Sequence, residues 1–215
     1  MIKQAIIPLA GLGTRLLPLT SVFAKELLPM NGKPGLEYIL DECIGAGIKE
    51  IIFIISKKKS MIKDYFYNDK FYKKVIKKKK DPRIIAEYKK ILKYKKMIKF
   101  VYQNKPKGTG DAVLRTEKFI KGKHFLMLFP DDLIIKKNCS KSMIATHKKF
   151  RTSVMACINV KKETVSRWGI YSIKKKLNKN NFLINGVIEK PSLNKAPSNK
   201  AVIGRYILPR EIFKK

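Results

Sequence analysis

A glycine-rich segment with fixed positive charge follows the first apolar run of the chain. It reads AGLGTRLLPLTSVFAKELLP and covers residues 10–29. Gly11 and Gly13 carry no Cβ, so a phosphate or a base can approach their backbone N–H groups closely. Arg15 offers a planar fork of donors to phosphate oxygens, and Lys25 adds a compact positive charge. This combination predicts a binding site for a nucleoside triphosphate.

Two other phosphate-binding patterns are absent from this segment. A dinucleotide-binding fingerprint needs a third glycine three positions after Gly13, where the chain has Leu16. A Walker loop needs Gly-Lys-Ser/Thr at the start of a helix, and the segment has no such triplet. Taken alone, the segment could equally be a glycine turn with surface cations, so the rest of the chain must decide.

The elements that position this segment follow from the apolar pattern. Short apolar runs predict strands at QAIIPLA, EIIFIIS, MIKFVYQ, HFLMLFPDD and TSVMACINV, followed by short strands between residues 168 and 208. Helical periodicity lies between these strands, at residues 34–45, at 60–96 with a break at Pro82, at 109–119 and before TSVMACINV.

Alternating strands and helices predict the fold class. We expect an α/β fold, a doubly wound and mostly parallel sheet with helices on both faces, in a single domain over residues 1–215. In such folds the ligand lies beyond the carboxyl ends of the strands. The glycine-rich segment, QNKPKGTGDA and PDD each follow directly on an expected strand. The three loops should therefore meet at one edge of the sheet.

The net charge of +33 points to anionic partners without specifying them. Only seven of the 49 basic residues are arginine, the residue that nucleic-acid readers favour. Residues 57–99 hold 18 basic and 4 acidic side chains, with tyrosines between them. A nucleic-acid-binding surface is one interpretation. We favour a solvated helical face, which leaves nucleic acid as the weakest of the candidate partners.

Location and membrane contact follow from what the sequence lacks. No apolar run is long enough to span a bilayer, so no membrane partner is expected. Cys43, Cys139 and Cys157 are odd in number, widely spaced and without a C-x-x-C pair. They indicate reduced thiols and a cytoplasmic location.

Six motifs occur in an order that resembles a known family. They are GLGTRLLPLT…AKELLP, QNKPKGTGDAV, PDDLI, WGIYSI, GVIEKPS and APSNKAVIGRYIL. Together they resemble the bacterial UTP–glucose-1-phosphate uridylyltransferases of the sugar-nucleotide pyrophosphorylase superfamily, from Lys3 to the end of the chain. APSNKAVIGRY favours this branch over the thymidylyltransferases, which remain an alternative. The resemblance implies a nucleotide-diphospho-sugar transferase fold of the glycosyltransferase-A type.

The resemblance also implies roles for residues on the triphosphate side of the site. Gly11, Gly13 and Arg15 would hold the base and triphosphate of UTP. Lys25 would bridge the phosphates of UTP and glucose 1-phosphate. Asp131, at a strand end, would hold Mg²⁺ through oxygen ligation. The phosphate of glucose 1-phosphate would then attack the α-phosphorus of UTP without a general base, because it is already ionised.

A second set of implied roles concerns the base and the sugar. Gln103 and Gly108 would read uracil, with glutamine offering both a donor and an acceptor to the base edge. Gly169 would leave room for the sugar ring. Glu189 would accept hydrogen bonds from glucose hydroxyls, and Lys190 would lie beside the sugar phosphate.

The chain departs from the family pattern in three places. Ala24 stands where proline is usual, and Asp111 stands where histidine is usual, close to the expected base site. The chain stops at Lys215, whereas the resemblance implies a further metal-binding aspartate, a sugar-phosphate lysine and helices for subunit contact beyond it. The complete form is expected to be a homo-oligomer. An inactive, truncated nucleotide-binding remnant is therefore a second alternative.

Overall fold

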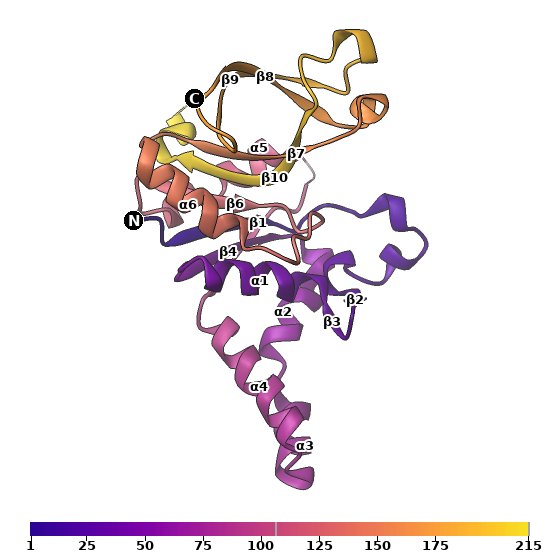
Figure 1. Ribbon diagram of the computed structural model, residues 1–215. Coiled ribbons are helices and arrows are strands. Elements are labelled where there is room, and N and C mark those ends of the chain that lie inside the picture. Colours follow the sequence, from indigo (N-terminus) through magenta and orange to yellow (C-terminus); the bar gives the residue numbers. More distant parts are fainter. Residues whose placement is uncertain (106, 215) are drawn as a thin grey trace.

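The computed structural model describes residues 1–105 and 107–214 and contains a mixed eight-stranded sheet (Figure 1). The strand order is β5-β4-β1-β6-β10-β8-β9, and β7 pairs with β10 beside this path. The strands are β1 (Gln4–Pro8), β4 (Glu50–Ile55), β5 (Ile98–Tyr102), β6 (His124–Leu128), β7 (Val154–Asn159), β8 (Gly169–Lys176), β9 (Phe182–Glu189) and β10 (Lys200–Pro209). A separate small hairpin pairs β2 (Pro29–Met30) with β3 (Lys33–Pro34).

The first half of the sheet is parallel and doubly wound, as predicted. β1 pairs in parallel with both β4 and β6, and β4 pairs in parallel with β5. Alternate residues of β1 enter different cores. Ala5 and Ile7 face α1 (Gly35–Gly45), α2 (Ser60–Tyr67), α4 (Pro82–Lys95) and α6 (Cys139–Phe150), whereas Ile6 faces α5 (Gly108–Leu114). Helices thus cover both faces, because the period of a strand sends successive side chains to opposite sides.

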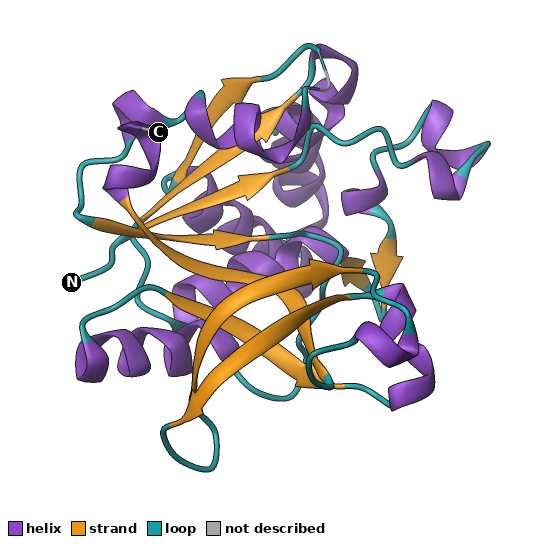
Figure 2. Cartoon of the chain, turned by 90° about the horizontal axis from the view of Figure 1, so that it is seen from above, coloured by secondary structure: helices purple, strands orange, loops and turns teal. Residues whose placement is uncertain are grey.

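The apolar run IIFII at residues 51–55 explains why β4 lies in the interior of this part. All five side chains are completely shielded from solvent. Burying one isoleucine or phenylalanine contributes about 1.5–3 kcal/mol, so such a run is stable only between two helical layers. In Figure 2 the strands fan out from one side of the molecule, and the loops after the parallel strands lie at the opposite side.

The second half of the sheet is antiparallel. β10 pairs antiparallel with β6, β7 and β8, and β8 pairs antiparallel with β9. β8 and β9 arch over β7 and β10 in Figure 1. Because β10 contacts both β6 and β8, this strand connects the parallel half of the sheet to the β8–β9 hairpin.

The lysine-rich region forms helices, as expected, and Pro82 begins the last of them. The side chain of Asp81 accepts a 2.8 Å hydrogen bond from the N–H of Arg83, which caps α4. α3 (Lys70–Lys79) and α4 form a hairpin that projects away from the sheet (Figure 1). The hairpin is held by stacking of Tyr72 on Tyr88, whose ring centroids lie 5.7 Å apart.

Over residues 1–105 and 107–214, none of the helices has the length and apolar character that crossing a bilayer requires.

Candidate active site

The glycine-rich segment folds into short 3₁₀ turns that return the chain to the sheet edge. Gly13 adopts a left-handed conformation with φ 70°, which favours glycine. A Cβ there would lie 3.0 Å from Cγ2 of Thr20 and 3.5 Å from Cδ of Lys25. Thr20 also donates a 2.8 Å hydrogen bond to the Gly13 carbonyl. Gly13 therefore allows the loop to close beside the stem of Lys25.

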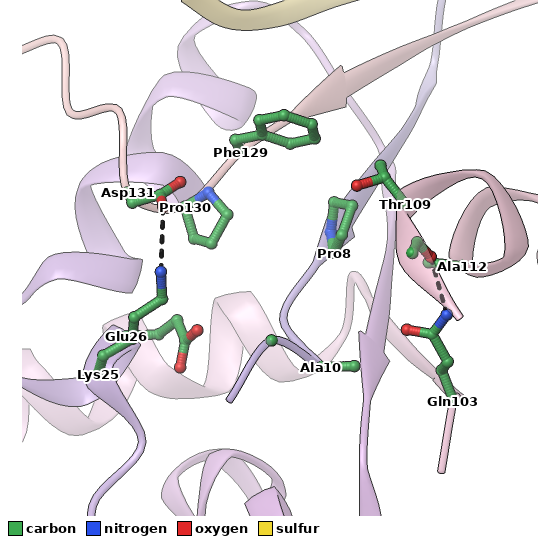
Figure 3. A pocket seen from close by; sticks show the side chains of 12 residues that line it. Pro8, Ala10, Lys25, Glu26, Gln103, Thr109, Ala112, Phe129, Pro130 and Asp131 are labelled. Carbon is green, nitrogen blue, oxygen red and sulfur yellow. Dashed lines mark hydrogen bonds and ion pairs between the residues drawn. The ribbon is translucent and has the colours of Figure 1, made fainter. Parts of the chain in front are cut away.

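A cavity of about 280 Å³ lies beyond the carboxyl ends of β1, β5 and β6 (Figure 3). Five of the residues predicted from the sequence line it together, namely Gly11, Lys25, Gln103, Gly108 and Asp131. The other lining residues are Pro8, Ala10, Glu26, Thr109, Ala112, Phe129 and Pro130. The three loops that follow strands therefore meet at one edge, as expected from a doubly wound sheet.

Lys25 and Asp131 form an ion pair on one side of this cavity. The Nζ of Lys25 lies 3.0 Å from Oδ2 of Asp131, and their side chains are 23% and 50% exposed. Burial alone would raise the pKa of Asp131, but the hydrogen bond and charge of Lys25 outweigh it and lower this pKa overall. The charge of Arg15, on the exposed part of the loop, acts in the same direction. The cations predicted to bind phosphate thus lie near the predicted metal ligand.

Gln103 lies on the opposite side of the cavity, and its orientation is fixed within the protein. Its side chain is buried, and its Nε2 donates to the carbonyl of Gly108 at 3.0 Å and to Oδ2 of Asp111 at 2.7 Å. Both amide hydrogens are therefore used, and the donor that we expected Gln103 to offer a base is already engaged. Asp111 is in turn held at 2.8 Å by Arg115, four residues later in the chain and directly after the end of α5.

A buried ion pair below the cavity was not predicted. The carboxylate of Glu26 accepts hydrogen bonds of 2.8 and 2.9 Å from the Nζ of Lys59, and both side chains are buried. Burial lowers the pKa of Lys59, and the charge of Glu26 opposes this shift. In the sequence, the feature that could have pointed to this ion pair was the position of Glu26 directly after Lys25. Nothing in the run of lysines at 57–59 marks Lys59 as the buried one.

The predicted sugar-binding residues gather at the β8–β9 hairpin. Gly169 and Glu189 are register partners, and a Cβ at 169 would lie 2.9 Å from Oε2 of Glu189 and 3.3 Å from Cγ2 of Val202. Lys190 has φ 47°, and its N–H donates to the Trp168 carbonyl at 3.0 Å. The Nζ of Lys190 lies 4.0 Å from Oε1 of Glu189.

β10 places this second group beside the cavity without making it part of the lining. Val202 contacts the position of Gly169, and Gly204, two residues further on, lies against Phe129 of the cavity wall. Two residues of a strand span about 7 Å. Gly169 and its register partner Glu189 thus lie near the cavity but outside its lining, and Lys190, Gly13 and Arg15 are outside the lining as well.

The turn that carries Asp131 is anchored from β10. The N–H of Gly204 donates to Oδ2 of Asp132 at 2.6 Å, so the carboxylate of Asp132 holds the backbone in place. Arg205 is completely buried and donates to the carbonyls of Phe129 and Asp132 at 3.1 and 2.7 Å. These contacts fix the turn on both sides of Asp131.

Comparisons with known proteins agree on one family. The family model for nucleotidyl transferases matches residues 4–215. A UTP–glucose-1-phosphate uridylyltransferase of Streptococcus pyogenes is 34% identical over an alignment of 220 residues that covers 99% of this chain and 71% of that protein. The chain thus spans about three quarters of the length of such relatives.

Solved structures lead to the same group. A UTP-bound UGPase from Acinetobacter baumannii matches with a TM-score of 0.90 and 32% identity, over 100% of this chain and 76% of that one. A UDP-glucose pyrophosphorylase complexed with UDP-glucose matches with a TM-score of 0.84 and 34% identity, over 100% and 78%. A glucose-1-phosphate thymidylyltransferase from Bacillus anthracis, at 19% identity and a TM-score of 0.75, shares the fold alone.

The sequence motifs, the sheet with its edge cavity and these comparisons converge on the same assignment. The chain belongs to the nucleotidyl transferase family, in the group of the UTP–glucose-1-phosphate uridylyltransferases.

Proposed function

We propose that this chain forms UDP-glucose and pyrophosphate from UTP and glucose 1-phosphate. The observation that carries the proposal is the meeting of Lys25, Asp131 and Gln103 around one cavity, in a chain of this family. Gln103 would face the base, and Lys25 would lie at the phosphates. At the β8–β9 hairpin, Gly169 would leave room for the sugar ring, Glu189 would accept hydrogen bonds from the glucose hydroxyls, and Lys190 would lie beside the sugar phosphate.

The chemistry requires charge neutralisation more than proton transfer. A phosphate oxygen of glucose 1-phosphate forms a bond to the α-phosphorus of UTP, and the bond from that phosphorus to pyrophosphate breaks. A phosphate monoester has a second pKa of about 6, so the attacking oxygen is already ionised near neutral pH. The task of the protein is to bring two anions together in line. Lys25 and Arg15 would supply the positive charge that this approach needs.

Mg²⁺ is the cofactor that we propose, and Asp131 is the residue that would hold it. Oδ2 of Asp131 accepts a hydrogen bond from Lys25, half of the Asp131 side chain is exposed, and the residue lines the cavity. In the part of the chain that the structure describes, no three His, Cys, Asp or Glu side chains gather into a metal cage. A single carboxylate nevertheless suits Mg²⁺, which commonly binds through one or two carboxylates together with substrate phosphates. Bound there, Mg²⁺ would add positive charge at the phosphate oxygens.

A direct assay tests the proposed function. The purified chain is incubated with UTP, Mg²⁺ and glucose 1-phosphate, and pyrophosphate and UDP-glucose are measured. We expect both products in equal amounts, with UTP preferred over dTTP. UTP binding without turnover would instead support an inactive nucleotide-binding remnant, and preference for dTTP would support a thymidylyltransferase. A folded sample that neither binds UTP nor forms product contradicts the proposal.

Substitution of Gly169 tests the sugar-binding part of the proposal. In Gly169→Ala the new Cβ would meet Oε2 of Glu189 at 2.9 Å and Val202 at 3.3 Å, so the carboxylate must move. Misplacing one hydrogen-bonding group costs on the order of tenfold. We expect the KM for glucose 1-phosphate to rise about tenfold, while UTP binding stays within about twofold.

A matched control lies in the same hairpin. Gly186 is opposite Ser172, and a Cβ at 186 would have its nearest neighbour, Cβ of Ser172, at 3.9 Å, an ordinary contact. Gly186→Ala should leave the KM for glucose 1-phosphate unchanged. Equal effects of both alanines would mean that the hairpin responds to stiffening and that Glu189 has no specific role.

Two further expectations from the sequence remain predictions for this chain. They are assembly into a homo-oligomer and a cytoplasmic location.

A further inference from the structure

We infer that Asp111, held by Arg115, is a positioning residue that turns the carboxamide of Gln103 so that only its oxygen faces the nucleotide cavity. The site would thereby select a base that presents a ring N–H, and so prefer uracil to cytosine. This inference rests on the proposed function, which supplies the pyrimidine nucleotide.

The hydrogen bonds of Gln103 allow one orientation of its amide. Nε2 donates to Oδ2 of Asp111 at 2.7 Å and to the carbonyl oxygen of Gly108 at 3.0 Å. A reversed amide would place Oε1 against these two acceptors with no hydrogen between them. Because Gln103 is only 6% exposed, water would not relieve that contact. In Figure 3 the amide oxygen accordingly points toward Ala10 and the nitrogen points away from it.

Arg115 holds Asp111 as an ionised carboxylate, which is the form that the observed orientation of the Gln103 amide requires. The Nε of Arg115 donates to Oδ2 of Asp111 at 2.8 Å, and the Nη2 of Arg115 donates to Oδ1 of Asp111 at 3.2 Å. The hydrogen bonds from Arg115 and then from Gln103 lower the pKa of Asp111, so the carboxyl stays ionised and can only accept. The guanidinium also offsets a negative charge that would otherwise oppose a triphosphate nearby. The departure at position 111 is therefore accommodated by a partner one helical turn away.

The side-chain oxygen Oε1 of Gln103 determines which edge of a base can bind. Oε1 has no hydrogen-bond partner among the residues that the structure describes, and it can only accept. Uracil presents N3–H between two carbonyl groups, whereas N3 of cytosine carries no hydrogen. An oxygen held opposite N3 attracts the first base and repels the second. Thymine shares the uracil edge, so this contact separates UTP from CTP and leaves dTTP to other contacts.

The variant Asp111→Asn tests the inference on the full chain. Its amide can present N–H to Gln103, which allows the glutamine to reverse. Dissociation constants of UTP and CTP, each with Mg²⁺, are measured by calorimetry. We expect the wild-type chain to bind UTP at least about tenfold more tightly than CTP. In Asp111→Asn the ratio should fall to within about threefold, through weaker UTP binding and unchanged or tighter CTP binding.

Two further variants separate positioning from folding. Arg115→Met frees Asp111 from its clamp and should shift the ratio in the same direction by a smaller factor; it serves alone if Asp111→Asn does not fold. Asp81→Asn is the matched control, because Asp81, which caps the start of α4, is also a carboxylate at the N-terminal end of a helix and pairs with a nearby arginine, Arg83, but lies outside the cavity lining. It should leave the ratio unchanged.

The outcomes distinguish this inference from the proposed function. If the wild-type chain makes UDP-glucose but Asp111→Asn weakens UTP and CTP equally, Asp111 is only structural and the inference fails while the function stands. A wild-type chain that binds both nucleotides equally also overturns the inference. A folded chain that binds no pyrimidine nucleotide overturns both.

Discussion

Replacing Lys25 with methionine is expected to lower kcat for UDP-glucose formation by about 100- to 1,000-fold. Removing one preorganised group that stabilises developing charge typically has an effect of this size. Methionine keeps the length and apolar character of the stem, which packs near Gly13, and removes only the charge. The loss should appear in kcat at saturating concentrations of both substrates. Pyrophosphate release under steady-state conditions measures it.

The same variant should barely change stability. The pair of Lys25 with Asp131 is partly exposed, at 23% and 50% of the two side chains, and such pairs contribute about 0–1 kcal/mol to folding. Lys33→Met is the matched control. It removes a lysine that pairs with Asp41 at 2.6 Å outside the cavity lining, and it should leave kcat unchanged. A Lys25→Met enzyme within about threefold of wild type would show that its charge is not needed at the phosphates.

The parts of the fold and site that could be predicted are those carried by local pattern. The run IIFII predicted a strand, and because it has no polar position the structure buries this strand on both faces. Pro82 predicted a break in the helical region, and the structure begins α4 at this residue, since proline fits the first turn of a helix. Gly11, Gln103 and Asp131 each follow a strand, and the parallel part of the sheet brings them to one cavity.

What the sequence could not predict depends on contacts between distant segments. Arg205 and Glu42 are 163 positions apart, and neither has a neighbour that marks it as buried. Lys59 is one of three consecutive lysines, and only the packed loop distinguishes it. The pairing of Asp111 with Arg115 was different. Its spacing of four on a helix was visible in the sequence and would have explained the unexpected carboxylate.

Arg205 is expected to have the largest effect on stability of any single side chain in the site region. Its guanidinium lies 2.8 Å from Oε2 of Glu42, and both side chains are almost completely shielded from solvent. Oε1 of Glu42 also accepts bonds from the N–H and hydroxyl of Ser140, at 3.0 and 2.6 Å. In Arg205→Met the carboxylate of Glu42 stays buried without its cation. Removing one partner of a buried pair costs about 3–5 kcal/mol.

This loss is measured as the free energy of unfolding in urea. It is large against the total of about 5–15 kcal/mol that holds a typical domain together. Arg83→Met is the matched control, because Arg83 pairs with Asp81 at the surface with 91% of its side chain exposed, and it should change stability by less than about 0.5 kcal/mol. If the free energy of unfolding of Arg205→Met were within about 1 kcal/mol of wild type, the buried Arg205–Glu42 pair would not stabilise the fold as expected.

Arg205 serves both stability, through Glu42, and the active site, through the turn around Asp131. A double variant separates these two roles. Replacing Glu42 as well, in Glu42→Gln/Arg205→Met, removes the unpaired buried charge, so the double variant should be more stable than Arg205→Met alone. Its activity should not recover. The carbonyls of Phe129 and Asp132 still lack the donors that hold the turn around Asp131. Recovery of both properties together would mean that Arg205 acts only by neutralising Glu42, and that the turn keeps its shape without it.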